Sequence, residues 1–407
     1  MEMRRRDLIF FPAAGVAARA MAAEADYPRS VPAYEEPLFQ LHTQFKAPVK
    51  IAAVEYLRNG KNTFVRVVSA DGVKGVVRTK DVDDFVPILL RRVAPAFVGR
   101  DARDLERIVD DVYIKHYKLA GQPFWSPVAA VEHAVWDLLG RTANKPVASL
   151  LGGIVRRQIP VYLSGSGRET TAEQEVDVYV RGIAETGAKA VKFKIGGRMS
   201  RNADAYPGRT KTMVHLARKL MGADVVLYAD ANGSYDSRVG IEVGKMLQDL
   251  GFRFFEEPCP WEEVSETRRV AQALQLSVAG GEQDSSLWKF QDMIERRVID
   301  IVQPDLNYCG GIIRACRVAR MARKANMTVV PHNTQTDAAA CKMIQFAAAT
   351  PNIGPHMEFP HRGGETYAAW YTPHFKIRNG KVDLPEGPGM GVEFDESFLH
   401  KAERVTA

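Results

Sequence analysis

The sequence has few cysteines, no block of basic residues and no long apolar run, and each absence argues against a class of protein. The four cysteines are scattered, without a CxxC pair or Cys/His spacing, so we expect neither a disulfide framework nor a structural zinc site. A formal charge of +6 is modest for 407 residues, and we find no helix-turn-helix or RNP pattern. We therefore expect no nucleic-acid partner.

The composition is that of an ordinary globular protein, 46% hydrophobic and 26% charged, and the length suits more than one domain. Residues 1–26 contain Arg5-Arg6, an alanine-rich stretch and small residues near 20–23, a pattern that resembles a twin-arginine export signal. We expect a periplasmic or exported protein. The alternative is a frayed helix or an overlong start, which would leave the protein in the cytoplasm. The stretch is too short and interrupted for a membrane span.

Residues 27–46 are interpreted as an extension, and residues 47–155 as an α+β capping domain. Within it, residues 49–77 alternate apolar and polar side chains between turn signals, which predicts a three-stranded antiparallel meander. Helical periodicity follows in three blocks, at about 83–95, 101–117 and 127–143. A Ser-Pro pair at Ser126 and Pro127 is expected to begin the last helix.

From residue 156 to 366 short apolar runs alternate with helical stretches, which predicts a parallel sheet closed into a modified TIM barrel, (β/α)7β. The predicted strands are 159–167, 190–197, 225–233, 252–258, 276–282, 300–306, 328–336 and 353–359. The predicted helices are 171–187, 209–221, 236–250, 262–274, 285–297, 311–325 and 337–349. Residues 367–407 contain a hairpin at Asn379-Gly380, and we expect this segment to pack on the capping domain.

Each predicted strand from the second to the eighth ends in a polar residue that a core does not favour. These residues are Lys192 and Lys194, Asp230, Glu256, Glu282, Asp305, His332 and Glu358. In barrels of this type the active site lies at the carboxyl ends of the strands, so the spacing predicts one ring of functional groups around a mouth. Helix caps explain one such residue but hardly the whole ring.

Three of these acids, Asp230, Glu256 and Glu282, come from consecutive strands. Three hard carboxylate oxygens suit Mg²⁺ better than zinc, and a cation would cancel their mutual repulsion. The alternative is three separate caps or barrel salt bridges.

His332 and Asp305 come from neighbouring strands, where the carboxylate would fix the imidazole tautomer for acid or base chemistry. A lone strand-end histidine is more often structural. Lys194, close to the second cation Lys192 and partly desolvated, is expected to have a depressed pKa and to act as a base. Lys192 would stabilise negative charge on a bound carboxylate. The alternative is a pair of lysines that extend to solvent from an edge strand.

The order K-x-K, Asp, Glu-Glu-Pro, Gly-Glu, Asp, His, Glu resembles the enolase superfamily, specifically its mandelate racemase-like subgroup. The resemblance covers roughly residues 47–395 and includes "AVEHAVWDLLGRTANKPVASLLGG" and "LPEGPGMGVEFD". It implies that Lys194 and the His332–Asp305 pair are the acid/base groups and that the three acids bind Mg²⁺. It also implies that Lys192, Glu358 and Asn232 contact the substrate.

The resemblance implies abstraction of the α-proton of a carboxylate substrate to an enediolate. β-Elimination of water would follow in an acid-sugar dehydratase, the activity that we favour. The alternative is a racemase, epimerase or cycloisomerase that uses the same enediolate. A third possibility, a binding protein with a vestigial site, is disfavoured because a binder needs no pair of bases. We expect a small-molecule carboxylate (sugar acid) substrate and a homo-oligomer.

One departure concerns the loop that determines specificity in this family. Here residues 58–62 form only a short turn, which we expect not to reach the barrel mouth. The extension, with Leu41, His42 and Phe45, is a hypothetical lid in its place. The long loop after the second strand carries Arg198, Arg201 and Arg209, which either meet a distal carboxylate or polyol of the substrate or form a solvated charged loop.

Overall fold

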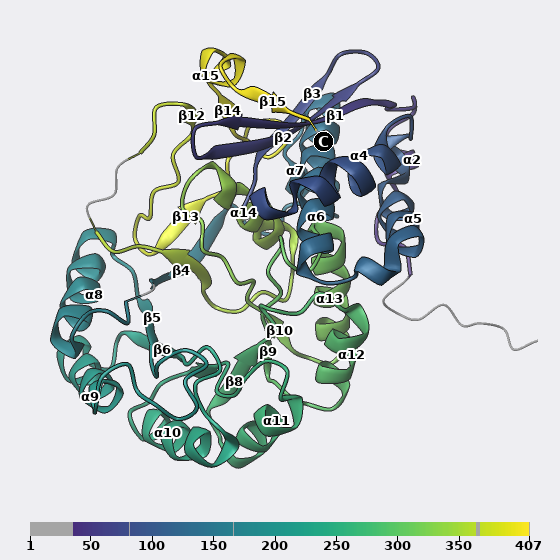
Figure 1. Ribbon diagram of the computed structural model, residues 1–407. Helices are drawn as coiled ribbons and strands as arrows, with labels where there is room; N and C mark the ends of the chain where they lie inside the picture. Colours follow the sequence, from purple (N-terminus) through teal and green to yellow (C-terminus); the bar gives the residue numbers. More distant parts are fainter. Residues whose placement is uncertain (1–35, 81, 166, 364–366, 407) are drawn as a thin grey trace, which may run out of the picture. The chain divides into compact units, whose positions relative to one another are not determined.

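In the computed structural model, which describes residues 36–80, 82–165, 167–363 and 367–406, an α+β cap packs on a barrel of parallel strands (Figure 1). This confirms the predicted fold class. The predicted export signal, residues 1–26, lies outside the described residues, as do residues 27–35 of the predicted extension. Export and the exact domain boundaries therefore stay predictions.

The cap is built on an antiparallel sheet whose strand order in the described chain is β15-β1-β2-β3. Three strands form the predicted meander: β1 (Ile51–Asn59), β2 (Asn62–Ser69) and β3 (Lys74–Arg78). The fourth strand, β15 (Glu403–Val405), comes from the end of the chain and pairs with β1. The C-terminal segment thus returns to the cap.

Two long helices complete the cap, α5 (Leu105–His116) and α6 (Gln122–Ala143). The prediction that the second begins at Ser126-Pro127 is wrong, because the helix starts at Gln122 and carries Pro127 inside it. Phe124 and Trp125 are at most 2% exposed. Burying these two rings gains several kcal/mol, more than the one backbone hydrogen bond that Pro127 removes. The short helices are α2 (Leu41–Gln44), α3 (Val86–Ile88), α4 (Ala94–Phe97) and α7 (Val147–Leu150).

All eight predicted barrel strands are present in the described residues, and they run parallel in the order β10-β9-β8-β7-β6-β5-β4-β11. Their bounds are β4 (Gln158–Ser164), β5 (Ala190–Lys194), β6 (Val226–Asp230), β7 (Phe254–Glu256), β8 (Ser277–Gly280), β9 (Ile301–Val302), β10 (Thr328–Val329) and β11 (Met357–Pro360). The ring closes at Val329 of β10, whose backbone bonds to Asn352 and Gly354 just before β11, at 2.9 and 3.0 Å.

The predicted helices also form, one after each of the first seven strands in the described part of the chain. They are α8 (Ala172–Thr186), α9 (Arg209–Met221), α10 (Ser237–Asp249), α11 (Val264–Ala273), α12 (Leu287–Glu295), α13 (Ile312–Lys324) and α14 (Cys341–Ala349). Local sequence sets their ends: α8 begins with a capping box between Thr171 and Gln174, and Gly187 ends it in the left-handed conformation.

The C-terminal segment adds four further short elements, β12 (Tyr371–Thr372), β13 (Lys381–Asp383), β14 (Glu393–Phe394) and α15 (Glu396–His400). Asn379 and Gly380 form the expected tight turn, with φ of 49° and 70°, and β13 then pairs antiparallel with β4. A search of the described helices finds none with the length and apolar character needed to cross a bilayer. The expected homo-oligomer stays a prediction.

Candidate active site

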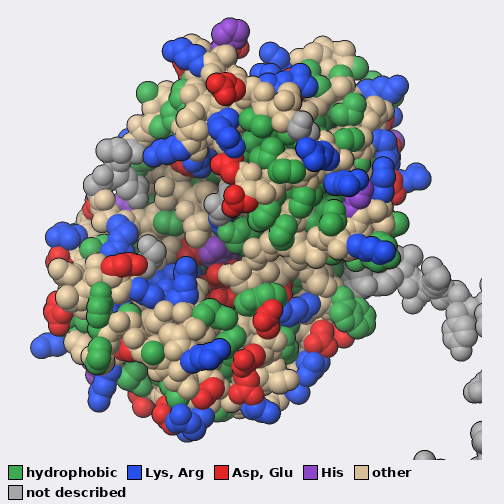
Figure 2. Space-filling view, in the orientation of Figure 1, with side chains coloured by type: hydrophobic (Ala, Val, Ile, Leu, Met, Phe, Trp, Pro, Cys, Tyr) green, Lys and Arg blue, Asp and Glu red, His purple; other side chains and the backbone are tan. Residues whose placement is uncertain are grey.

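The strand-end residues predicted from the sequence lie together at the carboxyl ends of the barrel strands. Each of the eight is at most 7% exposed. Lys192 and Lys194 are on β5, and Asp230 and Glu256 are the last residues of β6 and β7. The others follow the ends of β8, β9 and β10 or lie on β11: Glu282, Asp305, His332 and Glu358. In the space-filling view, charged side chains of both signs meet at the hollow between barrel and cap (Figure 2).

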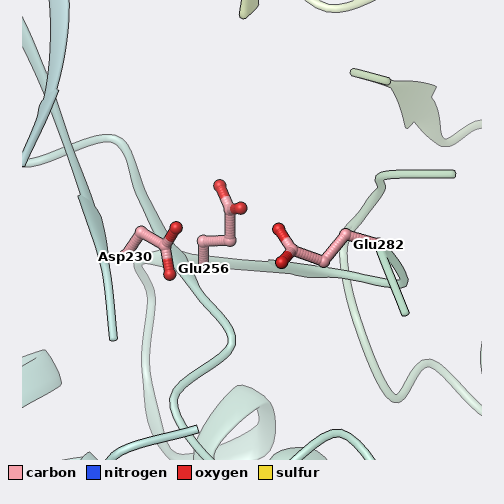
Figure 3. Close-up of side chains that lie close together, drawn as sticks. All are labelled: Asp230, Glu256 and Glu282. Atoms are coloured by element: carbon pink, nitrogen blue, oxygen red, sulfur yellow. The ribbon is translucent and has the colours of Figure 1, made fainter. Parts of the chain in front are cut away.

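Asp230, Glu256 and Glu282 each place one carboxylate oxygen within 4.8 Å of those of the other two. The carboxylates of Asp230 and Glu282 face each other on either side of Glu256 (Figure 3). Oε1 of Glu256 and Oε2 of Glu282 are buried and accept no hydrogen bond. Burial and the charge of Asp230 raise the pKa of Glu256 to about 8. Buried, under-bonded carboxylates that repel one another fit a hard divalent cation such as Mg²⁺.

The two lysines of β5 are the cations that face these acids. Lys192 Nζ lies 2.8 Å from Glu256 Oε2 and 2.9 Å from Glu358 Oε1. Lys194 donates a hydrogen bond to Asp230. The expected depression of the Lys194 pKa is wrong for this arrangement: burial and Lys192 lower it, but the carboxylates, chiefly Asp230, raise it further.

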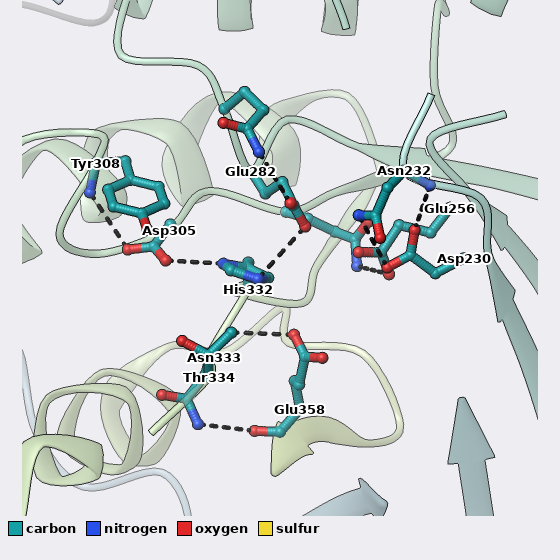
Figure 4. A network of polar contacts seen from close by, with 12 residues as sticks. Asp230, Asn232, Glu256, Glu282, Asp305, Tyr308, His332, Asn333, Thr334 and Glu358 are labelled. Atoms are coloured by element: carbon teal, nitrogen blue, oxygen red, sulfur yellow. Dashed lines mark hydrogen bonds and ion pairs between the residues drawn. The ribbon is translucent and has the colours of Figure 1, made fainter. Parts of the chain in front are cut away.

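His332 and Asp305 form the predicted pair, with 2.8 Å between Nδ1 and Oδ2 (Figure 4). Nε2 of His332 lies 3.5 Å from Oε2 of Glu282, so the ring stands between its aspartate partner and the acid cluster. Burial lowers the pKa of His332, but Glu282 and Asp305 outweigh it and raise the value to about 9. The aspartate fixes the tautomer and directs Nε2 toward the acids.

Glu358 is held at both of its oxygens. Oε1 faces Lys192, and Oε2 accepts a hydrogen bond from the backbone N–H of Asn333 at 3.1 Å (Figure 4). Although burial favours the neutral acid, Lys192 and His332 lower the pKa of Glu358 to about 2. Its charge is therefore matched by neighbouring cations.

Lys80, from the cap, is a residue that the sequence reasoning missed. Its Nζ lies 2.9 Å from Oδ2 of Asp305, the same oxygen that faces His332, and its side chain is 7% exposed. The ammonium group also lies 4.2 Å from the centre of the Tyr308 ring. Lys80 follows a short strand and belongs to no motif, so no sequence signal pointed to it.

Two cavities open at the mouth. One, of about 390 Å³, is lined by both expected bases, Lys194 and His332, and by Glu282 and Glu358. The other, of about 470 Å³, shares His332 and Glu282 with it. Further polar residues line the second cavity: Lys80, Gln122, Asn232, Gln283 and Thr334. The mouth therefore offers two titratable groups on the wall of one cavity, beside a polar pocket.

The residues expected to contact the substrate fall into different environments. Asn232 lines the larger cavity, but its side chain is engaged by Asp230 and by Arg168, whose Nη1 is 3.0 Å from Oδ1. Arg198 is exposed and lines both cavities. Arg209 is buried and donates to backbone carbonyls, including that of Thr170 at 2.8 Å. Arg209 is thus a structural residue in this fold and not a solvated or substrate-facing arginine.

The hypothetical lid is wrong for the described part of the extension. Leu41 and Phe45 are buried, and the backbone N–H of Phe39 donates to Glu106 of α5 at 2.9 Å. Described residues 37–46 line neither mouth cavity. The described residues 58–62 of the short turn line neither mouth cavity either.

Lys61 of that turn lines an outer cavity of about 620 Å³ together with Lys80 and Thr334, which also line the mouth. The cap thus contributes to the walls through its strand ends and turns.

Comparison with known proteins agrees with this architecture. Residues 36–152 match the family described as mandelate racemase / muconate lactonizing enzyme, N-terminal domain. Residues 175–398 match the family described as enolase C-terminal domain-like. The two matches cover the cap and most of the barrel.

Individual relatives span nearly the same region. The arabinonate dehydratase of Saccharolobus solfataricus is 27% identical over 76% of this chain and 81% of its own length. A solved structure from Roseobacter denitrificans, proposed to be a racemase, is 36% identical with a TM-score of 0.83, over 88% of this chain and 99% of that one. A mandelate racemase/muconate lactonizing protein from Paracoccus denitrificans, solved with magnesium, is 28% identical with a TM-score of 0.81 over the same shares.

Proposed function

The chain belongs to the mandelate racemase/muconate lactonizing enzyme family of the enolase superfamily, and from this membership we propose that it is a Mg²⁺-dependent dehydratase of sugar acids. The observation that carries the proposal is a single cavity lined by Lys194, His332, Glu282 and Glu358. A carboxylate substrate there would have its α-carbon between two proton-transfer groups and beside the acid cluster. The dehydratase name of a curated relative supports the reaction type.

In this proposal Asp230, Glu256 and Glu282 hold Mg²⁺, which when bound neutralises the substrate carboxylate and acidifies its α-proton. Lys192, positioned by Glu256 and Glu358, supplies a fixed positive charge where negative charge develops. Both functions stabilise the enediolate, because an α-carbon beside a carboxylate is otherwise a very weak acid.

When Asp230 holds the cation, its charge no longer favours the ammonium form of Lys194. The neutral amine of Lys194 then removes the α-proton, and the electron pair of that C–H bond forms the enediolate. When the bond from the β-carbon to its hydroxyl breaks, His332 Nε2 gives its proton to the departing oxygen, which leaves as water. The resulting enol becomes a 2-keto-3-deoxy acid. Asp305 keeps Nδ1 of His332 bonded, so Nε2 is the nitrogen that exchanges the proton.

A second candidate function is racemisation or epimerisation by the same two groups. Lys194 on β5 and His332 after β10 are separated in the barrel by β4 and β11 on one side and by four strands on the other, counted over the described residues. Groups across a mouth suit proton removal from one face and return on the other. The 36% identical structure proposed to be a racemase favours this alternative.

Proton NMR in D₂O with Mg²⁺ separates the two. A panel of aldonic, aldaric and uronic acids is incubated with the protein. New 2-keto-3-deoxy signals from one acid would support dehydration and name the substrate. Loss of the α-proton signal without a new carbon skeleton would support racemisation instead. Silence with every acid would count against the proposed substrate class.

Two lysine variants test whether the chemistry belongs to this cavity. Lys194→Met should abolish the change in the proton NMR signals of the substrate, since it removes the expected base. Lys189→Met is the matched control, because Lys189 is exposed and lies just before the same strand. Activity that survives Lys194→Met would overturn the assignment of the base.

A further inference from the structure

We propose that Lys80 of the cap is a positioning residue for the Asp305–His332 pair, so that the pair is complete only when the cap is docked on the barrel. This inference rests on the proposed function, because it takes His332 as a proton-transfer group.

The contact geometry ties Lys80 directly to the aspartate. Oδ2 of Asp305 has two partners, Lys80 Nζ at 2.9 Å and His332 Nδ1 at 2.8 Å. Oδ1 accepts from the backbone N–H of Asn307 at 2.7 Å and from its side-chain amide at 2.9 Å. With donors on both oxygens, the carboxylate plane cannot turn away from the imidazole without breaking several hydrogen bonds. Asp305 is fully buried, so water cannot replace a lost partner easily.

The lysine itself is held in place from the cap. Thr79, the preceding residue, pairs with Thr63 of β2 through its hydroxyl at 2.7 Å and its backbone N–H at 2.9 Å. One residue earlier, Arg78 reaches the barrel and lies 2.8 Å from Asp337. The end of β3 therefore fixes the position of Lys80 beside Asp305. Hydrogen bonds to β2 hold the chain on the cap side, and the ion pair with Asp337 holds it on the barrel side.

A purely structural salt bridge is a poor explanation for this contact. Burying an ammonium and a carboxylate removes the water that stabilises both charges, so buried pairs often add little stability. The cap and barrel are already joined beside it by Arg78 and Asp337, whose side chains are 20% and 32% exposed. What Lys80 adds is orientation: it holds the aspartate behind an imidazole whose other nitrogen faces the mouth.

A second alternative is that Lys80 binds substrate, because its side chain also lines the larger mouth cavity. The two roles differ in kinetics. A residue that contacts substrate in the ground state changes KM, whereas one that orients a proton-transfer group changes kcat. The experiment is built on that difference.

The test compares Lys80→Met with Lys74→Met, a matched change at an exposed lysine of β3, the strand that Lys80 follows. We expect Lys80→Met to lower kcat by about 10–100-fold with KM within about threefold, the loss typical of groups that orient a functional imidazole from behind. Lys80→Arg should restore part of kcat, because it keeps a cation of similar reach. Lys74→Met should change neither constant.

A double-variant cycle checks the route of the effect. If Lys80 acts through Asp305, Lys80→Met should cost almost nothing further in an Asp305→Asn background. Additive losses would overturn the proposal, since they would mean that Lys80 acts elsewhere. A rise in KM of tenfold or more with kcat unchanged would make Lys80 a substrate ligand, and that result too would overturn it.

A measurement without substrate separates this inference from the proposed function. The His332 Nδ1 proton, bonded to Asp305, should give a downfield imidazole signal that is absent in His332→Asn. We expect the signal to shift or broaden in Lys80→Met and to stay in Lys74→Met, whether or not any acid is turned over. An unchanged signal in folded Lys80→Met would refute the positioning role even if the dehydratase proposal holds.

Discussion

The two sides of the barrel mouth are built in different ways. On the side of β5 to β8 the lysines and carboxylates described above come from the barrel, and they contact one another directly. On the side of β9 and β10 the pair Asp305 and His332 depends on Lys80, which belongs to the cap and lies 225 residues before Asp305 in sequence. The first side is completed within one domain, and the second side only by contact between two.

This difference has a consequence for charge. The carboxylates of the first side share two lysines and retain buried oxygens without a hydrogen bond. On the second side Asp305 is fully bonded, and Lys80 and His332 hold the pKa of its carboxyl well below the usual range although burial opposes them. We therefore expect metal to bind on the first side. On the second side, we expect the position of the Asp305–His332 pair to depend on contact with the cap.

The largest expected effect comes from removing a carboxylate of the first side. Asp230→Asn should abolish Mg²⁺ binding measured by calorimetry and lower turnover by about 10³-fold or more, because a metal supplies several kcal/mol of charge stabilisation. Mg²⁺ at 100 times its Kd should raise the free energy of unfolding of the wild type by about 2.7 kcal/mol and leave the variant unchanged. Asp224→Asn, at an exposed aspartate just before β6, is the control. Mg²⁺ stabilisation that persists in Asp230→Asn would contradict the metal assignment.

The second prediction separates the two bases. His332→Asn should lower dehydration by about 10²–10⁴-fold, the usual contribution of a general acid. Exchange of the substrate α-proton with D₂O should continue in this variant, because Lys194 still removes the proton. In Lys194→Met both exchange and dehydration should stop. If His332→Asn loses exchange and Lys194→Met keeps it, the assignments of the two residues must be reversed.

The same comparison explains what the sequence could predict. The groups of the first side appear once per strand–helix unit, so spacing alone places Asp230, Glu256 and Glu282 at one mouth. Period-2 alternation does the same for the two lysines of β5. Lys80 follows no such rule, because its place depends on how the cap docks on the barrel.

Other differences also have their origin in tertiary packing. Helix α6 starts at Gln122 and not at Ser126, because two aromatic rings are buried in its first turn. The expected lid failed because Leu41 and Phe45 are buried among the cap residues rather than at the mouth. The raised pKa of Lys194 reflects the proximity of Asp230, which outweighs burial and the neighbouring lysine. None of these outcomes is encoded in local periodicity.

Two buried lysines near the second side differ in their partners, and this difference predicts different pKa values. Lys80 faces the Asp305 carboxylate, whereas Lys342 of α14 has neutral oxygen partners, Asn307 Oδ1 at 3.0 Å and the carbonyl of Arg78. Burial accordingly lowers the pKa of Lys342 to about 8 from its usual value of 10.5. Between these values the unfolded chain binds the extra proton, so this lysine makes the protein more stable as the pH rises from 8 to 10.5.

We therefore expect the wild type to gain about 3 kcal/mol of unfolding free energy relative to Lys342→Met across that pH window. Urea denaturation of both proteins at several pH values measures the difference. Lys245→Met, at an exposed lysine of α10, is the control for general effects of charge. A difference that stays constant with pH would mean that Lys342 keeps its proton in the fold.

The smallest expected effect concerns Arg198, which lines both cavities and so lies between the two sides. If it binds the distal part of the substrate, Arg198→Met should raise KM about tenfold, equivalent to about 1.4 kcal/mol, and leave kcat nearly unchanged. Its exposure keeps the effect below that of a buried charged hydrogen bond. Arg201→Met, in the same loop but not on the wall of either cavity, is the control. Steady-state kinetics measures the difference. Equal KM in both variants would mean that the distal contacts come from the cap. A rise of KM in Arg198→Met alone would assign them to the barrel loop after β5.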